Sequence, residues 1–438
     1  MMDPFSQHRI MRDNLREAKN QGLAALLDLG QSKIACLVLK FEPPKRVSIE
    51  SGLTAVSAYR VVGYASSRSG GIVNGRIVDP QRAADAVGLA LGKAQDAAKQ
   101  PFGHVIAAIS GGAPRSSHFF GSTEINGEAI TEEDISASLH ACDVPEPEPG
   151  RQYLHAHPVN FSVDHRSGIH DPRGEIGNLL SVDLQLVSIN QSVVDDWIRV
   201  MESCNVEIAG IAASPYTAGL STLVSQEVES GVACIDIGAG KTGVAIFCKK
   251  HMVHLREIRI GSEHITSDIS NAFGISINEA EKLKVMQGSA LATRRDDRSI
   301  CEFIKSNGTL GRITRTELIG VIKPRIEEIL EEVAAELENA GFGTSVSGRS
   351  VVLTGGCAHL RDLEELAKSV LGPSLRFGRP MRVNGMPQVM INPDYSAAVG
   401  LCLYASQPQD EYWDFPNASE ALTMAPIERT LKWLRDNW

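Results

Sequence analysis

The stretch "CIDIGAGKTGVAIF", Cys234–Phe247, decides the fold, because parts of it match two different phosphate-binding loops. A P-loop requires a glycine five positions before Gly240, where this chain has Ile235. A dinucleotide-binding loop requires its glycines to open a helix, but the residues that follow, Val244–Phe247, continue as a second apolar strand. The sequence therefore predicts a strand–turn–strand hairpin with the glycines in the turn.

A second stretch, "LLDLGQSKIACLVL" at Leu26–Leu39, is built in the same way. In each stretch a strand ends in Asp-x-Gly, a short turn carries hydroxyl and lysine side chains, and another strand follows. The two aspartates, Asp28 and Asp236, belong to different halves of the chain. Asp-x-Gly alone can be an ordinary turn without a ligand, but two copies favour a duplicated fold with a cleft between its halves.

The two hairpins have the chemistry of a nucleotide site. Glycine-containing turns let backbone N–H groups converge on phosphate oxygens. A carboxylate at the end of each strand would repel phosphates unless a cation lay between them, so Asp28 and Asp236 indicate Mg²⁺, held through its water molecules. A later strand ends in the pair Gly355–Gly356 of "LTGGCA", which suits a close approach of the backbone to adenine or its ribose.

The composition restricts the class of protein. The 438 residues are 43% apolar and 22% charged, which is typical of a soluble α/β protein with about three domains. A net charge of −10 argues against a general nucleic-acid binder, so no nucleic-acid partner is expected. The eight cysteines have no metal-ligand spacing, which is typical of core residues in a reducing cytosol. No stretch approaches the ~18 uncharged apolar residues of a membrane-spanning helix.

Strands and helices alternate along the rest of the chain. Residues 79–99 open with Asp-Pro and carry apolar residues at helical spacing, and a second helix is expected to begin at the Thr131 cap. Residues 314–340 predict a long amphipathic helix, and residues 350–366 predict a strand, a glycine pair and a helix.

This arrangement resembles the actin/Hsp70/sugar-kinase superfamily. Within it, residues 22–438 are similar to the FtsA family of bacterial cell-division proteins. The resemblance rests on the stretches "SGGIVNGRIVDPQRAADAVGLAL", "HVIAAISG", "NEAEKLKVMQG", "VIKPRIEEIL", "VLTGGCAHLRDLEELA", "YSAAVGL" and "RTLKWLRDNW". The last of these and an insert at about 84–178 separate the FtsA family from actin, from the rod-shape protein MreB and from chaperones.

The resemblance implies an α/β, actin-like (duplicated ribonuclease-H-like) fold with two halves around a nucleotide cleft. Residues outside the two halves would be a flexible tail at 1–21, a flexible linker at 406–426 and an amphipathic membrane-targeting helix at 427–438. The four subdomains would be 1A at 22–83 and 179–225, 1C at 84–178 as an SHS2-type insert, 2A at 226–262 and 311–405, and 2B at 263–310.

The resemblance also implies ATP and Mg²⁺ as cofactors. The nucleotide contacts would fall on Asp28, Gly30, Gln31, Ser32, Lys33, Asp236, Gly238, Gly240, Lys241, Thr242, Glu281, Lys284, Gly355 and Gly356, with Asp28 and Asp236 also serving the metal. Two alternatives stay open: Lys241 could contact a phosphate or point to solvent, and Glu281 and Lys284 could border the adenosine or lie on a solvated helix face.

The second hairpin departs from the family pattern. Gly243 stands where a second acid is usual, and a carboxylate there would help orient metal-bound or attacking water. We therefore expect ATP binding with slow or negligible hydrolysis, and no catalytic residue is assigned.

The end of the chain predicts an amphipathic helix. Its membrane-facing residues would be Ile427, Leu431, Trp433, Leu434, Arg435 and Trp438. Such a helix often docks on its own protein core, but the acidic, aperiodic stretch before it favours a membrane surface. One helix would bind weakly, at roughly 4–6 kcal/mol, so many copies on a polymer would attach far more firmly.

The resemblance implies a protein that polymerises on the cytoplasmic face of the inner membrane at the division septum and tethers the tubulin-like protein FtsZ to it. FtsZ would bind by its C-terminal tail at subdomain 2B, later division proteins would bind through 1C, and anionic lipid would bind the terminal helix. ATP would act as an assembly switch. The alternatives are a small-molecule kinase or ATPase of the same superfamily, and a type IV pilus actin-like adaptor.

Overall fold

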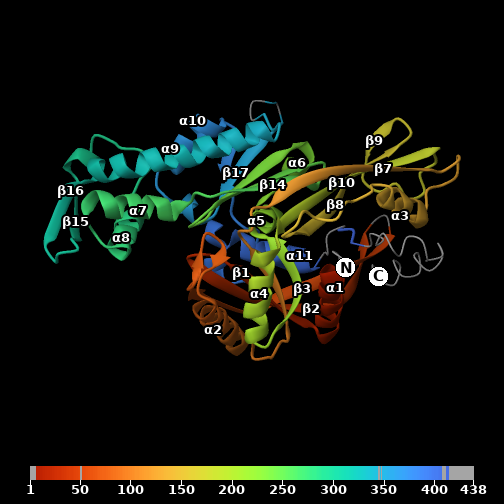
Figure 1. The fold of residues 1–438 in the computed structure, drawn as a ribbon, viewed down its shortest axis with the longest axis horizontal. Coiled ribbons are helices and arrows are strands. Elements are labelled where there is room, and N and C mark those ends of the chain that lie inside the picture. Colours follow the sequence, from red (N-terminus) through yellow and green to blue (C-terminus); the bar gives the residue numbers. More distant parts are fainter. Residues whose placement is uncertain (1–5, 50–51, 344–345, 347, 407–410, 414–438) are drawn as a thin grey trace.

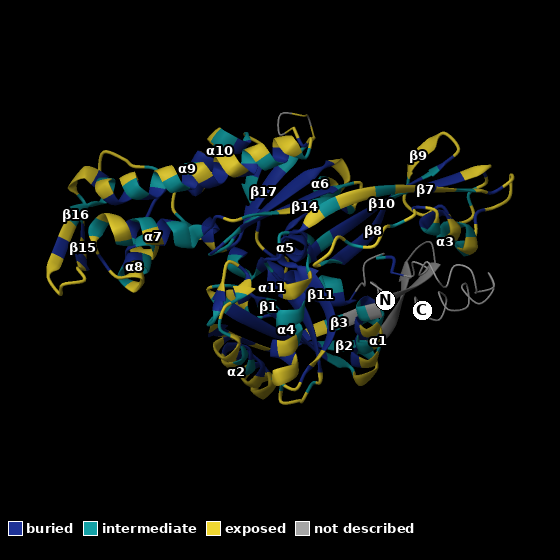
Figure 2. Cartoon of the chain, in the orientation of Figure 1, coloured by how far each residue is buried: buried dark blue, intermediate teal, exposed yellow. Residues whose placement is uncertain are grey.

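The computed structural model describes residues 6–49, 52–343, 346, 348–406 and 411–413. Figure 1 shows two large sheets that face each other across the middle of the molecule, with smaller units projecting to either side of the second sheet. Figure 2 shows that the central strands of both sheets are buried, whereas the outward faces of helices α2 (Pro80–Ala98) and α9 (Arg315–Asn339) are exposed.

The two large sheets have the same topology. The first has the strand order β11-β6-β1-β2-β3 and the second has the order β18-β17-β12-β13-β14. Asp28 pairs with Ala35 across the first hairpin, and Asp236 pairs with Gly243 across the second, so the two hairpins have the same register. The predicted duplication is therefore confirmed.

The two large sheets contain five strands each. They are β1 Leu23–Leu29, β2 Lys33–Ile49, β3 Gly52–Arg68, β6 His104–Ile109 and β11 Glu207–Ala213 in the first sheet, and β12 Val232–Ile237, β13 Thr242–Cys248, β14 His251–Ile258, β17 Ser350–Thr354 and β18 Leu375–Phe377 in the second. In both sheets the hairpin strands are antiparallel and the two later strands are parallel to the first strand.

The helices begin where the sequence places caps. Asp79 accepts a hydrogen bond from the backbone N–H of Arg82 at the start of α2. Thr131 and Thr314 form capping boxes at the starts of α3 (Glu132–His140) and α9. Further helices of the two halves are α4 Gln191–Ser203, α5 Ser214–Thr222, α6 Ser225–Ser230, α10 Leu363–Leu371 and α11 Ser396–Ser406, with short 3-10 turns at Gly356–His359, Gln388–Met390 and Pro393–Tyr395.

One helix from each half packs against the other half. Helix α5 follows the first sheet, yet its Pro215 ring lies against Gly243 and its Gly219 lies against Phe247 of the second sheet. Helix α11 follows the second sheet, yet it packs in the core of the first, and residues 383–405 contribute buried side chains to that core. The expectation that residues 311–405 all belong to subdomain 2A is therefore wrong at its C-terminal end.

Subdomain 1C is a separate four-stranded sheet with the order β7-β10-β8-β9, covered by α3 and holding its own buried core. Its strands are β7 Arg115–Glu124, β8 Arg151–Val163, β9 Arg166–Ile169 and β10 Leu179–Asn190. The expected bounds of 84–178 are therefore wrong. Strand β6 belongs to the first sheet, and helix α2 packs in the core of the first half. Strand β10 belongs to the insert, because its hydrogen-bonded neighbours are β7 and β8.

The projection on the other side corresponds to subdomain 2B. It consists of α7 Ser262–Phe273, α8 Ile277–Gln287, a 3-10 turn at Asp296–Arg298, and the hairpin β15 Ile300–Ile304 and β16 Leu310–Thr314. The hairpin extends to Thr314, so the expected boundary at residue 310 falls at the start of its second strand. A smaller hairpin consists of β4 Ile72–Val73 and β5 Arg76–Ile77, and Gly75 in its turn lines the cavity between the halves.

The expected flexible tail at 1–21 is wrong for the residues that the structure describes. Residues Ser6–Gln21 form helix α1, whose Met11, Leu15 and Ala18 are buried in the core of the first half. The side-chain amide of Asn14 also donates to the carbonyl of Ile208 on β11, at 2.8 Å. The many charges of this segment hide an apolar face with helical spacing.

The expected linker at 406–426 is also wrong in part. Tyr412 and Trp413 are only 6% and 5% exposed and pack in the core of subdomain 1C. The predicted membrane helix, with Ile427, Leu431, Trp433, Leu434, Arg435 and Trp438, lies outside the described residues. Within the described part of the chain, no helix combines the length and the apolar character needed to cross a bilayer. Six of the eight cysteines are buried, as predicted.

We predict that α1 contributes measurably to stability. Leu15 is 9% exposed and Ile10, on the same helix, is 61% exposed. Leu15→Ala should lower the free energy of unfolding by about 2–3 kcal/mol, because it leaves a cavity under the helix. Ile10→Ala should change it by less than about 0.5 kcal/mol. Urea unfolding followed by circular dichroism measures both, and equal effects would show that α1 does not pack as described.

Candidate nucleotide site between the two halves

A cavity of about 1010 Å³ lies between the two halves. Both hairpin turns, the glycine pair after β17, and helices α7 and α8 contribute to its wall. The cavity brings together the following sequence-predicted residues: Asp28, Gly30, Gln31, Ser32, Lys33, Asp236, Gly238, Gly240, Lys241, Glu281, Lys284, Gly355 and Gly356.

Thr242 is the exception. Its side chain is fully buried, and its hydroxyl donates to the carbonyl oxygen of Ile260 at 2.8 Å. Thr242 is the first residue of β13, where side chains alternate between the two faces of the sheet, and its side chain points into the core of the second half. The prediction that Thr242 contacts a nucleotide is therefore wrong for its side chain.

Asp28 and Asp236 face the same cavity from opposite halves. Burial raises the pKa of Asp28 to about 6, although the positive charge of Lys33 partly lowers it. Burial also raises the pKa of Asp236 to about 7, and the negative charges of Asp28 and Glu257 raise it further. Two enclosed carboxylates that disfavour each other's ionisation are a donor set that fits a divalent cation with oxygen ligands.

Glycine is required next to Asp236. Gly355 has a φ of +88°, and a Cβ at this position would lie 2.3 Å from Oδ1 of Asp236. The turn after β17 thus reaches the acid only because residue 355 has no side chain. This close approach brings the third predicted motif into the same site as the second hairpin.

Gly243, where the family pattern has an acid, is explained by helix α5. A Cβ on Gly243 would lie 2.1 Å from Cγ of Pro215, so the proline ring occupies the place of a side chain. A different acid lies beside this position. Glu257 on β14 is the cross-strand partner of Gly243, and its carboxylate lines the cavity.

Glu257 and Lys241 form an enclosed ion pair. Their charged groups are 3.2 Å apart, and the side chains are 11% exposed for Lys241 and 3% for Glu257. Glu257 also accepts a hydrogen bond of 2.7 Å from the backbone N–H of Gly111, which belongs to the first half. Burial raises the pKa of Glu257, while Lys241 and the Gly111 N–H work against that shift. The solvent-facing alternative for Lys241 is therefore wrong.

Lys33 in the first hairpin pairs with Asp394, which comes after the last strand of the second sheet in the sequence. Its ammonium group pairs with Asp394 and lies 3.4 Å from the centre of the Tyr395 ring. His359 lies 3.2 Å from the same carboxylate. Burial would raise the pKa of Asp394, but the hydrogen bond and charge of Lys33 lower it below its usual range. Lys33 is thus a positive group fixed at the cavity wall.

Gln31 bridges the two halves directly. Its side-chain amide donates to Glu263 at the start of α7, and its amide oxygen accepts a hydrogen bond of 2.6 Å from the backbone N–H of Asn74. A Cβ on Gly240 would lie 2.1 Å from the same oxygen, so the second hairpin also approaches Gln31 closely. Contacts of this kind depend on the separation of the two halves.

Glu281 and Lys284 lie on the cavity side of α8. Their charged groups are 2.7 Å apart, and Lys284 also donates to the carbonyl oxygen of Ser262 at 3.1 Å. Lys284 is 11% exposed, whereas Glu281 is 47% exposed. The solvated-face alternative is therefore wrong for Lys284 and fits Glu281 only in part.

The cavity is also lined by residues that the sequence patterns did not predict. Among them are Gly75, Ser110, Ser214, Pro215, Glu257, Glu263, His359 and Asp394. One signal was present in the sequence: β6 is followed by Ser110 and two glycines, much as β17 ends in Thr354 and two glycines. The acids gave no local signal, because only the strand register and the closure of the cavity bring them to the site.

Comparisons with known proteins identify the family. The family model described as "Cell division protein FtsA" matches residues 233–400, and the one described as "SHS2 domain inserted in FTSA" matches residues 111–188. The FtsA protein of Rhizobium meliloti is 31% identical over 392 residues, which cover 88% of each chain. The chain belongs to the FtsA family of cell-division proteins. The FtsA proteins of Agrobacterium fabrum and Escherichia coli are 29% and 27% identical, over 96% and 89% of this chain and 96% and 92% of their own length.

A solved structure agrees with the predicted actin-like fold. A structure described as the PilM-PilN type IV pilus biogenesis complex covers 88% of this chain and 99% of its own, with a TM-score of 0.60 at 16% identity. That likeness shows the fold alone. The match at residues 111–188 agrees with the bounds of subdomain 1C that the sheet pairing gives, rather than with those expected from the sequence.

We predict that Asp236 makes the protein without nucleotide less stable above neutral pH. The pKa of Asp236 is about 7 in the folded protein, so the folded state binds more protons than the unfolded state between about pH 4 and 7. Its contribution to stability therefore falls as the pH rises through this window. Asp236→Asn should raise the free energy of unfolding at pH 8 by roughly 1–3 kcal/mol and change it little at pH 4.5.

Urea unfolding at the two pH values, without divalent cations, measures this difference. Asp96→Asn on the exposed face of α2 is the matched control and should show no pH-dependent gain. A variant at Asp236 that is no more stable than the natural protein at pH 8 would contradict the assignment of an enclosed carboxylate pair.

Proposed function

We propose that this FtsA-family protein binds ATP with Mg²⁺ between its halves and polymerises as a membrane-attached adaptor for FtsZ. The observation that carries the nucleotide part is the shared cavity, in which two matched hairpins place carboxylates and lysines from both halves around one space. A cavity of about 1010 Å³ is large enough for a nucleoside triphosphate and its hydrated cation.

The lining residues support a definite orientation. The hairpin turns around Gly30 and Gly238 would receive the phosphates on their backbone N–H groups. Lys33 and Lys241 would neutralise phosphate charge, and Lys284 and the Gly355–Gly356 turn would border the adenosine. Asp28 and Asp236 would hold Mg²⁺ through its water molecules, and the cation would supply charge neutralisation there.

The residues of the same site favour slow or negligible hydrolysis of ATP. Gly243 provides no carboxylate, and the neighbouring Glu257 is occupied by Lys241 and by the N–H of Gly111. An acid in these two contacts is a poor general base for water. Since Gln31 and Glu257 both connect the halves, nucleotide binding would shift the cleft toward an assembling conformation without turnover.

Two exposed apolar surfaces support the adaptor role. In subdomain 2B, α8, β15 and β16 expose Val285, Met286, Ile300, Ile304 and Leu310, and a surface of this kind suits the short C-terminal tail of FtsZ. In subdomain 1C, Phe120 on the edge strand β7 is 63% exposed. An edge strand with an exposed aromatic side chain suits a neighbouring subunit or a later division protein.

Attachment to the cytoplasmic face of the inner membrane is proposed from the sequence of residues 427–438 alone. Its apolar face and basic residues match a helix that lies on an anionic lipid surface. Because one such helix binds weakly, polymerisation and attachment would reinforce each other at the septum.

We predict opposite effects of two substitutions on nucleotide affinity. Lys241→Met should weaken the binding of a fluorescent ATP analogue about tenfold or more, because a positive group near the phosphates is lost. Glu257→Gln should strengthen it several-fold, because Lys241 is released from its partner and a nearby negative charge is removed. Fluorescence titration with Mg²⁺ measures both, and EDTA should weaken binding to the natural protein.

Lys93→Met on the exposed face of α2 is the matched control for the lost lysine and should bind normally. Absence of ATP-analogue binding by the natural protein would overturn the nucleotide proposal. Normal binding by Lys241→Met would remove only the role given to this lysine.

We predict that attachment to lipid depends on the terminal helix. The natural protein should sediment with vesicles containing anionic lipid, and more of it should do so with ATP. Deletion of residues 427–438, or Trp433→Glu combined with Leu434→Glu, should abolish sedimentation and leave nucleotide binding intact. Asn437→Ala is the control. If the truncated protein still sediments with vesicles, the terminal helix is not the anchor.

A further inference from the structure

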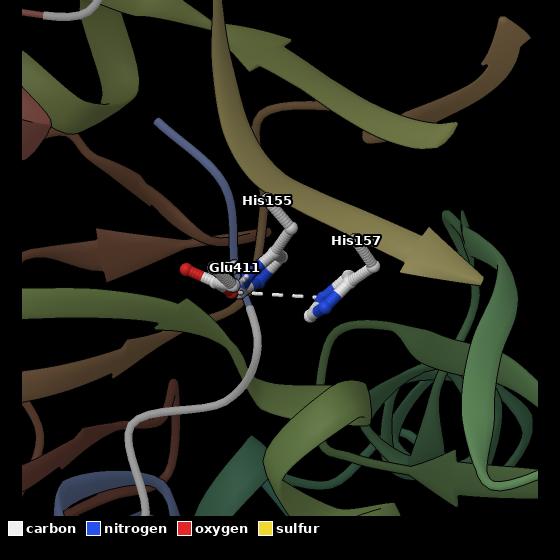
Figure 3. A group of neighbouring side chains, drawn as sticks. All are labelled: His155, His157 and Glu411. Atoms are coloured by element: carbon white, nitrogen blue, oxygen red, sulfur yellow. Dashed lines mark hydrogen bonds and ion pairs between the residues drawn. The ribbon is translucent and has the colours of Figure 1, made fainter. Parts of the chain in front are cut away.

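A cluster of titratable side chains lies outside the nucleotide cavity. His155 and His157 project from the same face of β8, because they are two residues apart, and Glu411 reaches them from residues 411–413 (Figure 3). Oε1 of Glu411 lies 2.7 Å from Nδ1 of His155 and 3.6 Å from Nε2 of His157. The three side chains are 0%, 6% and 9% exposed for His155, His157 and Glu411.

The cluster has the composition of a metal site, since one ligand atom from each residue lies within 4.8 Å of the others. The hydrogen bonds of His155 argue against a metal. The backbone N–H of Ala213 donates to Nε2 of His155 at 3.1 Å, so Nε2 carries a lone pair and the proton is on Nδ1. A metal on Nδ1 would require the proton on Nε2, where it would face the N–H of Ala213.

Both oxygens of the Glu411 carboxylate accept hydrogen bonds. Nδ1–H of His155 donates to one oxygen, and the indole N–H of Trp413 donates to the other at 3.1 Å. Tyr404 on α11 hydrogen-bonds to Glu411 as well. Burial would raise the pKa of Glu411, but the neighbouring His155 lowers it below its usual range, so the carboxylate is ionised. Glu411 and His155 are therefore held by hydrogen bonds, whereas Nε2 of His157 is buried without a hydrogen-bond partner.

Residues 411–413, which we call the strap, are held at the joint between subdomains 1A and 1C. The backbone N–H of Tyr412 donates to the carbonyl oxygen of Ala156 on β8 at 2.9 Å. The Tyr412 hydroxyl lies 2.9 Å from Nε2 of His140 on α3. The ring of Trp413 stacks on His8 of α1, with centroids 3.7 Å apart and an interplanar angle of 4°.

The residues that bind the strap are close in sequence to residues of the nucleotide cavity. Ala213, whose N–H fixes His155, is the residue immediately before α5. The next two residues, Ser214 and Pro215, line the cavity, and Pro215 lies against Gly243, close to the turn of the second hairpin. A displacement of the start of α5 would therefore alter the hydrogen bond that sets the proton position on His155.

We propose that the strap docks reversibly on His155 and that a ligand in the cavity strengthens this docking through the start of α5. The part of this proposal that concerns the ligand rests on the proposed ATP site. The strap precedes the predicted membrane helix, so its release would move the attachment point of the C-terminal segment from Trp413 back to the end of α11, and this would add up to about 25 Å to the reach of that segment. Docking would thus set how far the body of the protein can lie from the attached helix.

The amide hydrogen of Tyr412 reports on docking, because it is bonded to Ala156. Hydrogen–deuterium exchange of the full chain, followed by mass spectrometry, measures its protection. Glu411→Gln keeps the shape and removes the charge, and it should speed exchange at Tyr412 about tenfold or more without changing exchange in β1 and β12. Trp413→Ala should act in the same direction. The exposed Glu338→Gln on α9 is the matched control and should change nothing.

Addition of ATP and Mg²⁺ should slow exchange at Tyr412 of the natural protein several-fold, and Glu411→Gln should weaken nucleotide binding by the same factor, because coupling between two sites is reciprocal. Unchanged exchange at Tyr412 in both strap variants would overturn the docking site. Bound nucleotide that leaves Tyr412 unaffected would overturn the coupling. If no nucleotide binds, the proposed function and the coupling both fail, while the strap variants still decide the docking site.

The metal alternative is tested in the same experiment. Addition of Zn²⁺ alone should neither bind at one equivalent in calorimetry nor slow exchange at Tyr412. Binding at one equivalent that is lost in His157→Ala and in Glu411→Gln would assign the cluster to a metal and overturn the role given to Ala213.

Discussion

The structure depends on one electrostatic constraint, which is that two carboxylates from different halves are enclosed in the same cavity. Asp28 and Asp236 occupy matching positions in duplicated hairpins, and the charge of Asp28 is among the causes that raise the pKa of Asp236. Two such groups can both be ionised at low free-energy cost only when positive charge lies between them. The closure of the two halves is therefore linked to protons or to a cation, which is the physical basis of the proposed switch.

The other contacts between the halves are arranged around this pair. Gln31 and Glu257 each bond to a group of the opposite half, and Lys33 is held by Asp394 after the second sheet. Helix α5 packs across the boundary, where Pro215 occupies the space beside Gly243. The same helix begins next to the residue that fixes the strap, so a single rigid element contacts both the cavity and the seat of the C-terminal segment.

Local patterns predicted the parts of the molecule that local interactions specify. The two hairpins, the capped helices α2, α3 and α9, and the glycine pair after β17 were found because turn residues, caps and apolar spacing act within a few positions. The bounds of subdomain 1C were missed because β6 and β10 are both apolar strands, and only their hydrogen-bonded neighbours assign them to different sheets. Helix α1 was missed because its charges obscured the buried face of Met11, Leu15 and Ala18.

The sequence by itself determined the duplicated hairpins and the acids at their strand ends, because register within a hairpin depends on neighbouring residues. Only the tertiary structure decided which further groups reach the cavity. Glu257 meets Gly243 through cross-strand pairing, and Thr242 turns its hydroxyl into the core. The hydrogen bond between His155 and Glu411 joins positions more than 250 residues apart. The backbone N–H of Ala213 sets which ring nitrogen of His155 carries the proton for this bond. Contacts over such separations arise from the packing of complete sheets and leave no periodic signal in the chain.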